Sequence, residues 1–323
     1  MTVVLPGFLD AHVHLALFDP ARLAAGGIGR VLDLGGWTPA AAELGDHAGG
    51  DRPEARFAGQ FLGAPGGYPS RQAWAPAGSS CPVAAPADAV EAVHRQATAG
   101  ASVIKVTLNS AAGPVLTADT LVAIVTAAHK RMLPVAAHTE GAGQAEAAFD
   151  AGVDLLAHTP FSERLSDALL GSMAGRITWI STLDIHGWGE PTAAFHLASD
   201  NLARFHAAGG RVLYGTDLGN GPLPVGLNRR EITALLACGL SPDDVLTALT
   251  ADFPGRPDAA SVAAASGERP DRAGPVTVIP GDRPADPHDL AGFTDWLLSA
   301  HALPAHALPA RALTRPDLED LRS

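Results

Sequence analysis

Short runs of apolar residues alternate with amphipathic segments along most of the chain. Near-continuous apolar runs are typical of strands buried on both faces of a parallel sheet, so each run is a predicted strand. The eight runs lie at residues 8–14, 31–36, 57–62, 102–108, 133–138, 153–158, 177–183 and 211–217. Between them, apolar positions spaced as on one face of a helix predict helices at residues 87–100, 117–132, 143–151, 162–173, 193–208, 227–238 and 242–250. Thr117 is the predicted N-cap of the second helix.

Eight strands alternating with helices in roughly 250 residues predict an α/β protein with a (β/α)8 TIM barrel over residues 1–255. The site of such a barrel lies at the carboxyl ends of its strands. Residues 63–86 form a long Gly/Pro/Ser-rich stretch and are a candidate active-site loop. Residues 256–300 are predicted to be a linker and the remnant of a small β domain, with a short strand at 275–279. Residues 301–323 are an Ala/Pro-rich tail whose prolines disfavour a regular helix.

Composition narrows the classes of partner and compartment. The formal net charge of −12 argues against nucleic acid, whose phosphates require a basic patch. No uncharged apolar run is long enough to cross a membrane, and no segment has the layout of a signal peptide, so we expect a cytoplasmic protein. Cys81 and Cys238 lie far apart and are expected to be free thiols. The expected partner is therefore a small-molecule substrate, with neither nucleic acid nor a membrane.

Polar residues at the strand ends are the candidate chemistry. His12 and His14 are two positions apart, so on a strand they point to the same side and form half of a divalent-metal site. In a barrel they converge with residues from four other strands, which are Lys105, His138, His158 and Asp217. Apart from His186, the remaining histidines lie on predicted helices, in loops or in the tail, where surface or packing roles are expected. Lys105 is one of only two lysines among 22 basic residues, which suggests chemistry that arginine cannot perform.

The stretch Pro-Gly-Phe-Leu-Asp-Ala-His-Val-His-Leu at residues 6–15 resembles the opening signature of the amidohydrolase superfamily. Val-Ile-Lys-Val, Val-Ala-Ala-His, Ala-His-Thr and Gly-Thr-Asp follow in the superfamily's order and extend the resemblance over about residues 3–250. The stretch between His138 and Pro160 is most similar to the imidazolonepropionase and prolidase-like branch. The resemblance implies that His12, His14 and Asp217 hold one metal and that His138 and His158 hold a second. It also implies that Lys105 reacts with CO₂ to give N6-carboxylysine, which bridges the two ions.

Four imidazoles and a carboxylate suit divalent ions, with Zn²⁺ as the expected metal. The resemblance therefore implies a binuclear hydrolase that cleaves C–N bonds of amides, cyclic amides, N-acyl amino acids or dipeptides through a metal-bridging hydroxide. Asp217 is the expected proton acceptor and donor. His186 and Tyr68 are candidate substrate-binding residues, whereas Asn220 is interpreted as part of an Asn-Gly turn.

Three alternatives to C–N hydrolysis stay open at this point. A lactonase or phosphotriesterase could use the same site. A Schiff-base lyase could use Lys105 as its nucleophile, which leaves the four histidines without a role. A barrel could also serve as a non-catalytic binding module.

The chain departs from the superfamily outside the barrel. Most members carry a small β-sandwich built from segments before and after the barrel, but only five residues precede the opening motif here. A truncated or vestigial β-sandwich is therefore expected. The predicted strand at 275–279 must pack on the barrel, on residues 2–5 or on another subunit, so a homo-oligomer is also an open option.

Overall fold

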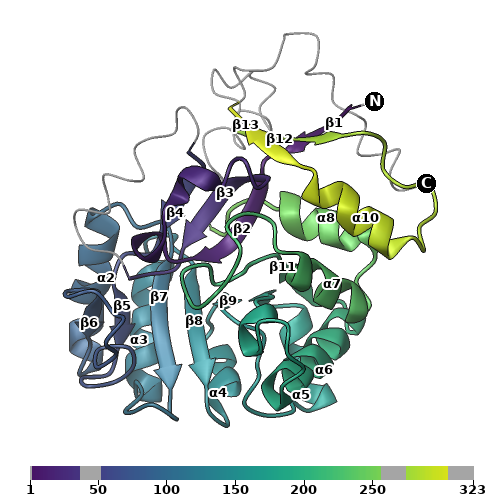
Figure 1. The fold of residues 1–323 in the computed structure, drawn as a ribbon. Helices are drawn as coiled ribbons and strands as arrows, with labels where there is room; N and C mark the ends of the chain where they lie inside the picture. The colour runs from purple at the N-terminus through teal and green to yellow at the C-terminus, as the bar shows by residue number, and fades with distance from the viewer. Residues whose placement is uncertain (1, 37–51, 256–273, 305–323) are drawn as a thin grey trace.

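The computed structural model describes residues 2–36, 52–255 and 274–304, and its central feature is a set of parallel strands (Figure 1). A three-stranded parallel sheet contains β2 (Phe8–Val13), β3 (Ile28–Asp33) and β4 (Glu54–Phe57) in chain order. A seven-stranded sheet has the order β11-β10-β9-β8-β7-β5-β6. Its members are β5 (Phe61–Gly63), β6 (Ser80–Pro82), β7 (Ile104–Asn109), β8 (Val135–Glu140), β9 (Leu155–Leu156), β10 (Thr178–Ile180) and β11 (Arg211–Leu213). All neighbouring pairs in this sheet are parallel, as expected for strands joined by helical crossovers.

Backbone hydrogen bonds join the two parallel sheets on both sides. On one side, Ala11 N donates to Tyr214 O at 2.9 Å and His14 N donates to Leu218 O at 2.8 Å. On the other side, Ser102 N, just before β7, donates to Phe57 O at 2.9 Å. One buried apolar cluster contains residues of β2 and β3 together with residues of β8, β9, β10 and β11. Strands from both sheets therefore share one interior.

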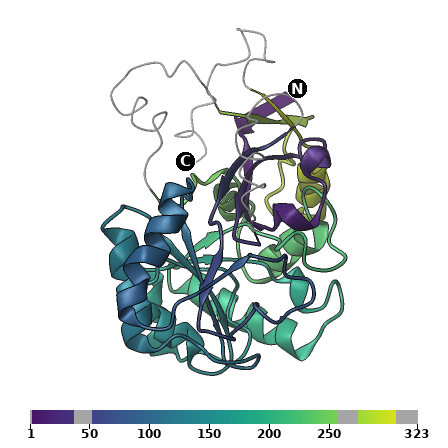
Figure 2. The ribbon, with the colours of Figure 1, turned by 90° about the vertical axis from the view of Figure 1, so that its left-hand side faces the viewer.

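Helices pack on the outer side of these strands (Figures 1 and 2). They are α2 (Pro86–Thr98), α3 (Ala118–His129), α4 (Gln144–Asp150), α5 (Asp167–Ala174), α6 (Ala193–Ala207), α7 (Arg229–Ala237) and α8 (Pro242–Thr250). Thr117 is confirmed as the N-cap of α3, because its side chain accepts a hydrogen bond from Thr120 N. A larger buried apolar cluster joins the helices to the strands and includes the stack of Trp179 on Phe205, with ring centroids 3.9 Å apart. No helix in the described part of the chain is long and apolar enough to cross a membrane.

Two predicted elements differ from the structure between residues 57 and 86. The apolar run at 57–62 is not one strand, because Gly59 adopts a positive φ of 81° and separates β4 from β5. The predicted loop that follows also contains a strand, β6, which pairs with β5 and places Cys81 opposite Leu62. The remainder of this segment crosses the carboxyl ends of the strands and carries Tyr68 to the candidate site, where its ring stacks on His138.

A small antiparallel sheet lies beside the parallel strands and brings both ends of the described chain together (Figure 1). Strand β12 (Val276–Pro280) is its centre and pairs with β1 (Thr2–Pro6) over five residues. The predicted strand at 275–279 therefore packs on the segment before the opening motif, which was one of its three expected partners. On its other edge β12 pairs with β13 (His301–Leu303).

Strand β13 falls within a segment that was predicted to be an irregular tail. Its pairing with β12 and a hydrogen bond from Ala302 N to Ala24 O (2.8 Å) supply the backbone partners that the Pro-rich sequence did not indicate. Helix α10 (Leu290–Leu298) lies between β12 and β13, and Asp289 caps its N-terminus by accepting a hydrogen bond from Gly292 N. Most of the predicted linker and the tail beyond Pro304 lie outside the described residues.

Candidate metal centre

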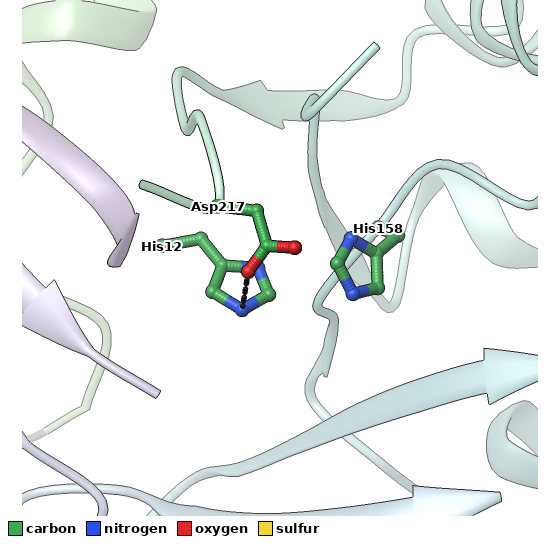
Figure 3. Close-up of side chains that lie close together, drawn as sticks. All are labelled: His12, His158 and Asp217. Atoms are coloured by element: carbon green, nitrogen blue, oxygen red, sulfur yellow. Dashed lines mark ion pairs between the residues drawn. The ribbon is translucent and has the colours of Figure 1, made fainter. Parts of the chain in front are cut away.

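The carboxyl ends of the strands bring three predicted ligands into one buried cluster (Figure 3). His12 lies on β2, His158 follows β9 and Asp217 follows β11. One ligand atom of each lies within 4.8 Å of the others, and all three side chains are buried. Figure 3 shows the Asp217 carboxylate against the His12 imidazole, with a dashed line marking their contact, and the His158 imidazole beside them. This spacing is short enough for a single cation to contact all three.

His14 and His138 extend the cluster into a row of four imidazoles. The ring centroids of His14 and His12 are 5.1 Å apart, those of His12 and His158 are 4.7 Å apart, and those of His158 and His138 are 5.0 Å apart. All four side chains are buried. The structure therefore places the histidines from the ends of β2, β8 and β9 side by side, as the strand-end pattern predicted.

Three of the imidazoles are oriented through Nδ1. His12 Nδ1 lies 2.7 Å from Ala157 O, and His14 Nδ1 lies 2.7 Å from Gly35 O. A backbone carbonyl only accepts, so in both residues Nδ1 carries a proton, and in the neutral form of either ring Nε2 keeps its lone pair. His158 Nδ1 lies 2.9 Å from Thr182 Oγ1. Such outer contacts fix the tautomer and ring direction of metal-binding histidines.

The backbone conformation and the neighbouring side chains of Asp217 determine where its carboxylate lies and whether it is ionised. Its φ is 58°, in the left-handed region, and its backbone N donates to His12 O at 2.8 Å. Its Oδ1 lies 3.1 Å from His12 Nε2 and 2.9 Å from His14 Nε2. Although burial alone acts to raise the pKa of Asp217, the adjacent His12 and His14 hold it well below its usual value. Asp217 is therefore an ionised carboxylate facing two imidazoles.

Several polar atoms of this cluster lack hydrogen bonds. Among the described residues, His12 Nε2, His138 Nε2 and Asp217 Oδ1 are buried without a hydrogen-bond partner. Buried polar atoms are normally satisfied, so a group of them in one place calls for an explanation. Bound divalent cations would account for all three, because imidazole Nε2 and carboxylate oxygen are among their preferred ligands. The residues present therefore fit the metals that the sequence implied.

The protonation states also fit a cation. Burial lowers the pKa of His12 and of His158 well below the ordinary value and lowers that of His138 as well, so these imidazoles are neutral at neutral pH. For His14, burial acts in the same direction, but the Asp217 carboxylate outweighs it and the pKa is raised. A bound cation would compete with that proton, because only the neutral ring is a ligand.

Lys105, on β7, is buried close to this cluster. Burial lowers the pKa of its ammonium to about 7, against the attraction of Asp217 and Asp33. Its charge in turn contributes to the lowered pKa of His12, His138 and His158. The strand-four lysine is therefore electrostatically coupled to the candidate ligands from three other strands.

Two further buried carboxylates, Asp10 and Asp33, accept hydrogen bonds from backbone N–H groups near the ends of the strands. Asp10 accepts hydrogen bonds from His12 N (3.1 Å) and from Thr216 N and Oγ1 (3.0 and 2.5 Å), so it ties β2 to the segment that carries Asp217. Asp33 accepts from Leu15 N and Gly35 N and thereby holds the carbonyl group that orients His14. Burial raises the pKa of Asp10 to about 7 and that of Asp33 to about 6.

Both predicted substrate-binding residues lie around the histidine row. The Tyr68 ring stacks on His138, with centroids 4.8 Å apart and planes inclined by 25°. His186 lies in the 3₁₀ turn η4 (Asp184–His186) after β10, with its ring 4.2 Å from that of Phe161. Its Nε2 is buried without a partner in the described structure, and burial lowers its pKa to about 4. A neutral imidazole with a free ring nitrogen can bind a polar substrate atom.

Two residues near the site were not selected from the sequence. Glu140 Oε2 lies 3.4 Å from His138 Nε2 and accepts a hydrogen bond from Asn109 Nδ2 at 2.7 Å. The His-x-Glu spacing at the end of β8 could have indicated it, because alternate strand residues share a side. Asn220, interpreted as a turn residue, does more than turn the chain, since its Nδ2 donates to Asp217 Oδ2 at 2.8 Å.

The strand order and the site together define an α/β protein with a buried cluster of candidate metal ligands, and the comparisons with known proteins assign its family. A family model described as the amidohydrolase family matches residues 3–252, so the chain belongs to that family. No curated protein sequence matches the chain.

The chain is also similar to solved structures at low sequence identity. It matches an ochratoxinase from A. niger with a TM-score of 0.71 and 20% identity, covering 94% of this chain and 82% of that one. A Xaa-Pro dipeptidase with bound methionine in its active site matches with a TM-score of 0.68 and 20% identity, covering 91% and 84%. A molinate hydrolase matches with a TM-score of 0.64 and 17% identity, covering 94% and 82%. These similarities support the α/β fold with its parallel strands.

Proposed function

We propose that this protein is a binuclear metal-dependent hydrolase that cleaves C–N bonds in small molecules. One observation carries the proposal, which is the convergence of four histidines and Asp217 with unpaired ligand atoms in a buried cluster. Membership of the amidohydrolase family agrees with it. In this proposal His12, His14 and Asp217 hold one ion, His138 and His158 hold the other, and carboxylated Lys105 joins them, with Zn²⁺ as the expected metal.

We further infer that the two parallel sheets form one closed (β/α)8 barrel and that β1, β12 and β13 are a reduced form of the family's β-sandwich. The backbone hydrogen bonds from Ala11 to Tyr214 and from His14 to Leu218 support the first inference. The pairing of β12 with β1 supports the second. In such a barrel the candidate ligands lie at the carboxyl ends of the strands, where catalysis takes place.

In the proposed mechanism, bound divalent ions lower the pKa of water and polarise the scissile carbonyl group. The chain's own residues handle the proton and the substrate. Asp217 takes the proton of the attacking water and passes it to the leaving nitrogen, because its ionised carboxylate already faces the cluster. His186 and Tyr68 position the substrate. Burial raises the pKa of the Tyr68 hydroxyl, so this hydroxyl stays protonated and can donate a hydrogen bond.

The proposed substrates are dipeptides, N-acyl amino acids and cyclic amides. The experiment is a hydrolysis panel of these compounds, with lactones and phosphotriesters as competing classes, on protein reconstituted with Zn²⁺ and bicarbonate. We expect two bound ions per chain, a mass gain of one CO₂ on Lys105 and the highest kcat/KM on a C–N substrate. Protein that binds no divalent ion under these conditions, or that prefers a lactone or phosphotriester, contradicts the proposal.

The Schiff-base alternative is tested on the same sample. Borohydride reduction in the presence of a carbonyl substrate would trap a Lys105 adduct in a lyase. We expect no adduct, because the row of buried histidines around Lys105 has no role in that chemistry. A non-catalytic barrel predicts full metal occupancy with no turnover of any compound in the panel.

A further inference from the structure

The turn that carries His186 is held by the first turn of α7. Glu231, on α7, is completely buried and accepts two consecutive backbone hydrogen bonds. Its Oε1 accepts from Leu183 N at 3.0 Å, and its Oε2 accepts from Asp184 N at 2.8 Å. Leu183 and Asp184 stand at the beginning of the turn η4. Both oxygens of the Glu231 side chain therefore hold the backbone where the chain leaves the end of β10.

Two neighbours of Glu231, Asn228 and Arg230, bind the side chain of Asp184 in the same turn. Asp184 is buried, and its Oδ2 accepts a hydrogen bond from Asn228 Nδ2 at 2.7 Å. Arg230 Nε lies 2.8 and 2.9 Å from the two oxygens of Asp184. Asn228 is itself fixed, because its backbone N donates to the Tyr214 hydroxyl at 2.8 Å. Three residues of one helical turn therefore bind two consecutive residues of the loop.

These contacts determine where the His186 imidazole lies. His186 N donates to Leu183 O at 3.2 Å, and Trp188 N donates to Asp184 O at 2.6 Å, so the rest of the turn is built on the two residues that α7 holds. The ring of His186 packs on Phe161, and its Nε2 is buried without a hydrogen-bond partner in the described structure. Among the described residues, the His186 side chain has no hydrogen-bond partner that could fix it independently. Its position depends on the turn.

We propose that Glu231 is a positioning residue for substrate binding, which acts by fixing the turn that presents His186 to the metal centre. The proposal rests on the proposed function, in which His186 contacts the substrate. A neutral cap would not replace Glu231, because two adjacent N–H groups require two acceptor atoms and only a carboxylate offers both at this spacing. In Glu231→Gln one oxygen becomes an NH₂ donor that faces a backbone N–H, and the turn loosens.

The kinetic test is a double-mutant cycle with His186. We expect Glu231→Gln to raise KM roughly tenfold on the panel's best substrate with a smaller change in kcat, the effect of leaving one buried backbone N–H without its acceptor. In a His186→Ala background the same substitution should change KM by less than about twofold, since the residue it positions is absent. Arg230→Met, at a side chain that is 40% exposed, should give a weaker effect with the same dependence on His186.

A second measurement does not depend on activity. Amide hydrogen exchange at residues 183–188 of the metal-loaded protein should become faster in Glu231→Gln and in Arg230→Met. The matched control is Asp244→Asn, which alters a carboxylate that caps α8 through Ser241 and should leave exchange at 183–188 unchanged. Unchanged exchange in both test variants, or KM effects that add fully to that of His186→Ala, overturns the proposal. If the panel contains no substrate, the proposed function fails, while the exchange data still decide whether Glu231 holds the turn.

Discussion

Asn220 donates a hydrogen bond from Nδ2 to Oδ2 of Asp217, while Oδ1 of the same carboxylate faces His12 and His14. The two oxygens of Asp217 therefore have different partners. Oδ2 is held by the turn that follows β11, and Oδ1 faces the two imidazoles. This division fixes the carboxylate plane without using the oxygen that would bind metal in the proposed function.

Asn220→Ala should lower kcat/KM by about tenfold, because a hydrogen bond to a charged group contributes about 1.5–3 kcal/mol and its loss frees the carboxylate to rotate. Steady-state kinetics on the best substrate of the panel measures the effect. Asn220→Ser, which keeps a short donor, should retain more activity than the alanine variant. Equal activity in the wild type and Asn220→Ala would show that the turn has no part in orienting Asp217.

Thr182→Val should weaken metal binding by about 10- to 100-fold, since it removes the hydroxyl that contacts His158 Nδ1. Competition with a metal-ion indicator measures the affinity. Thr139→Val is the matched control, because the Thr139 hydroxyl is buried near His138 but has no hydrogen-bond partner in the described structure. Similar losses in both variants would attribute the effect to general packing and contradict the role given to Thr182.

The pH dependence of stability should contain a contribution from His186. Its pKa in the folded protein is about 4, below the 6.5 of an unperturbed histidine. Between these values the unfolded chain binds a proton that the folded protein does not, so the free energy of unfolding increases as pH rises from about 4 to 6.5. His186→Asn should therefore show a flatter curve over this range. Denaturant unfolding of both proteins at intervals from pH 4.5 to 7.5 measures the difference, and parallel curves would contradict the burial of a neutral imidazole.

Gly7→Ala should destabilise the protein by about 1–3 kcal/mol, because a Cβ at this position would lie 2.7 Å from the carbonyl oxygen of Pro275. Gly171, in the middle of α5, is the control, since a Cβ there meets no atom within 4 Å. Gly171→Ala should be neutral or stabilising by up to about 1 kcal/mol through helix propensity. Thermal unfolding of the two variants gives the comparison, and a Tm for Gly7→Ala equal to that of the wild type would rule out a tight junction at Pro275.

The sequence predicted the parts of this site that follow from short-range periodicity. Two-residue alternation placed His12 and His14 on one side of β2, and the strand ends indicated that His138, His158 and Asp217 would meet them. The apolar run at 57–62 was wrongly predicted to be one strand, since a single glycine, Gly59, divides it between two sheets. The φ of Gly59 depends on its surroundings, so the division could not be predicted from the run itself. Strand β13 was missed for a similar reason, because its stability comes from β12 and Ala24 rather than from its own residues.

Glu231 shows why the supporting contacts could not be found in the same way. In the sequence it is an acidic residue in the first turn of an amphipathic helix, where a solvent-exposed carboxylate is the ordinary expectation. Its partners, Leu183 and Asp184, are 48 and 47 positions away. No local pattern encodes that distance. Only the packing of α7 against the end of β10 shows that the carboxylate is buried.

The junction at Gly7 has a consequence for the order in which the nascent protein can mature. Phe8, on the strand that carries His12, donates its backbone N–H to Thr277 Oγ1, which lies 269 positions later. At about 5–20 residues per second, the ribosome needs on the order of tens of seconds to add the intervening chain. His12 is thus synthesised long before Thr277, and its strand acquires this anchor on β12 only after the intervening chain has been made. The strand that carries the first two candidate ligands therefore stays without its contact to Thr277 until β12 has been synthesised.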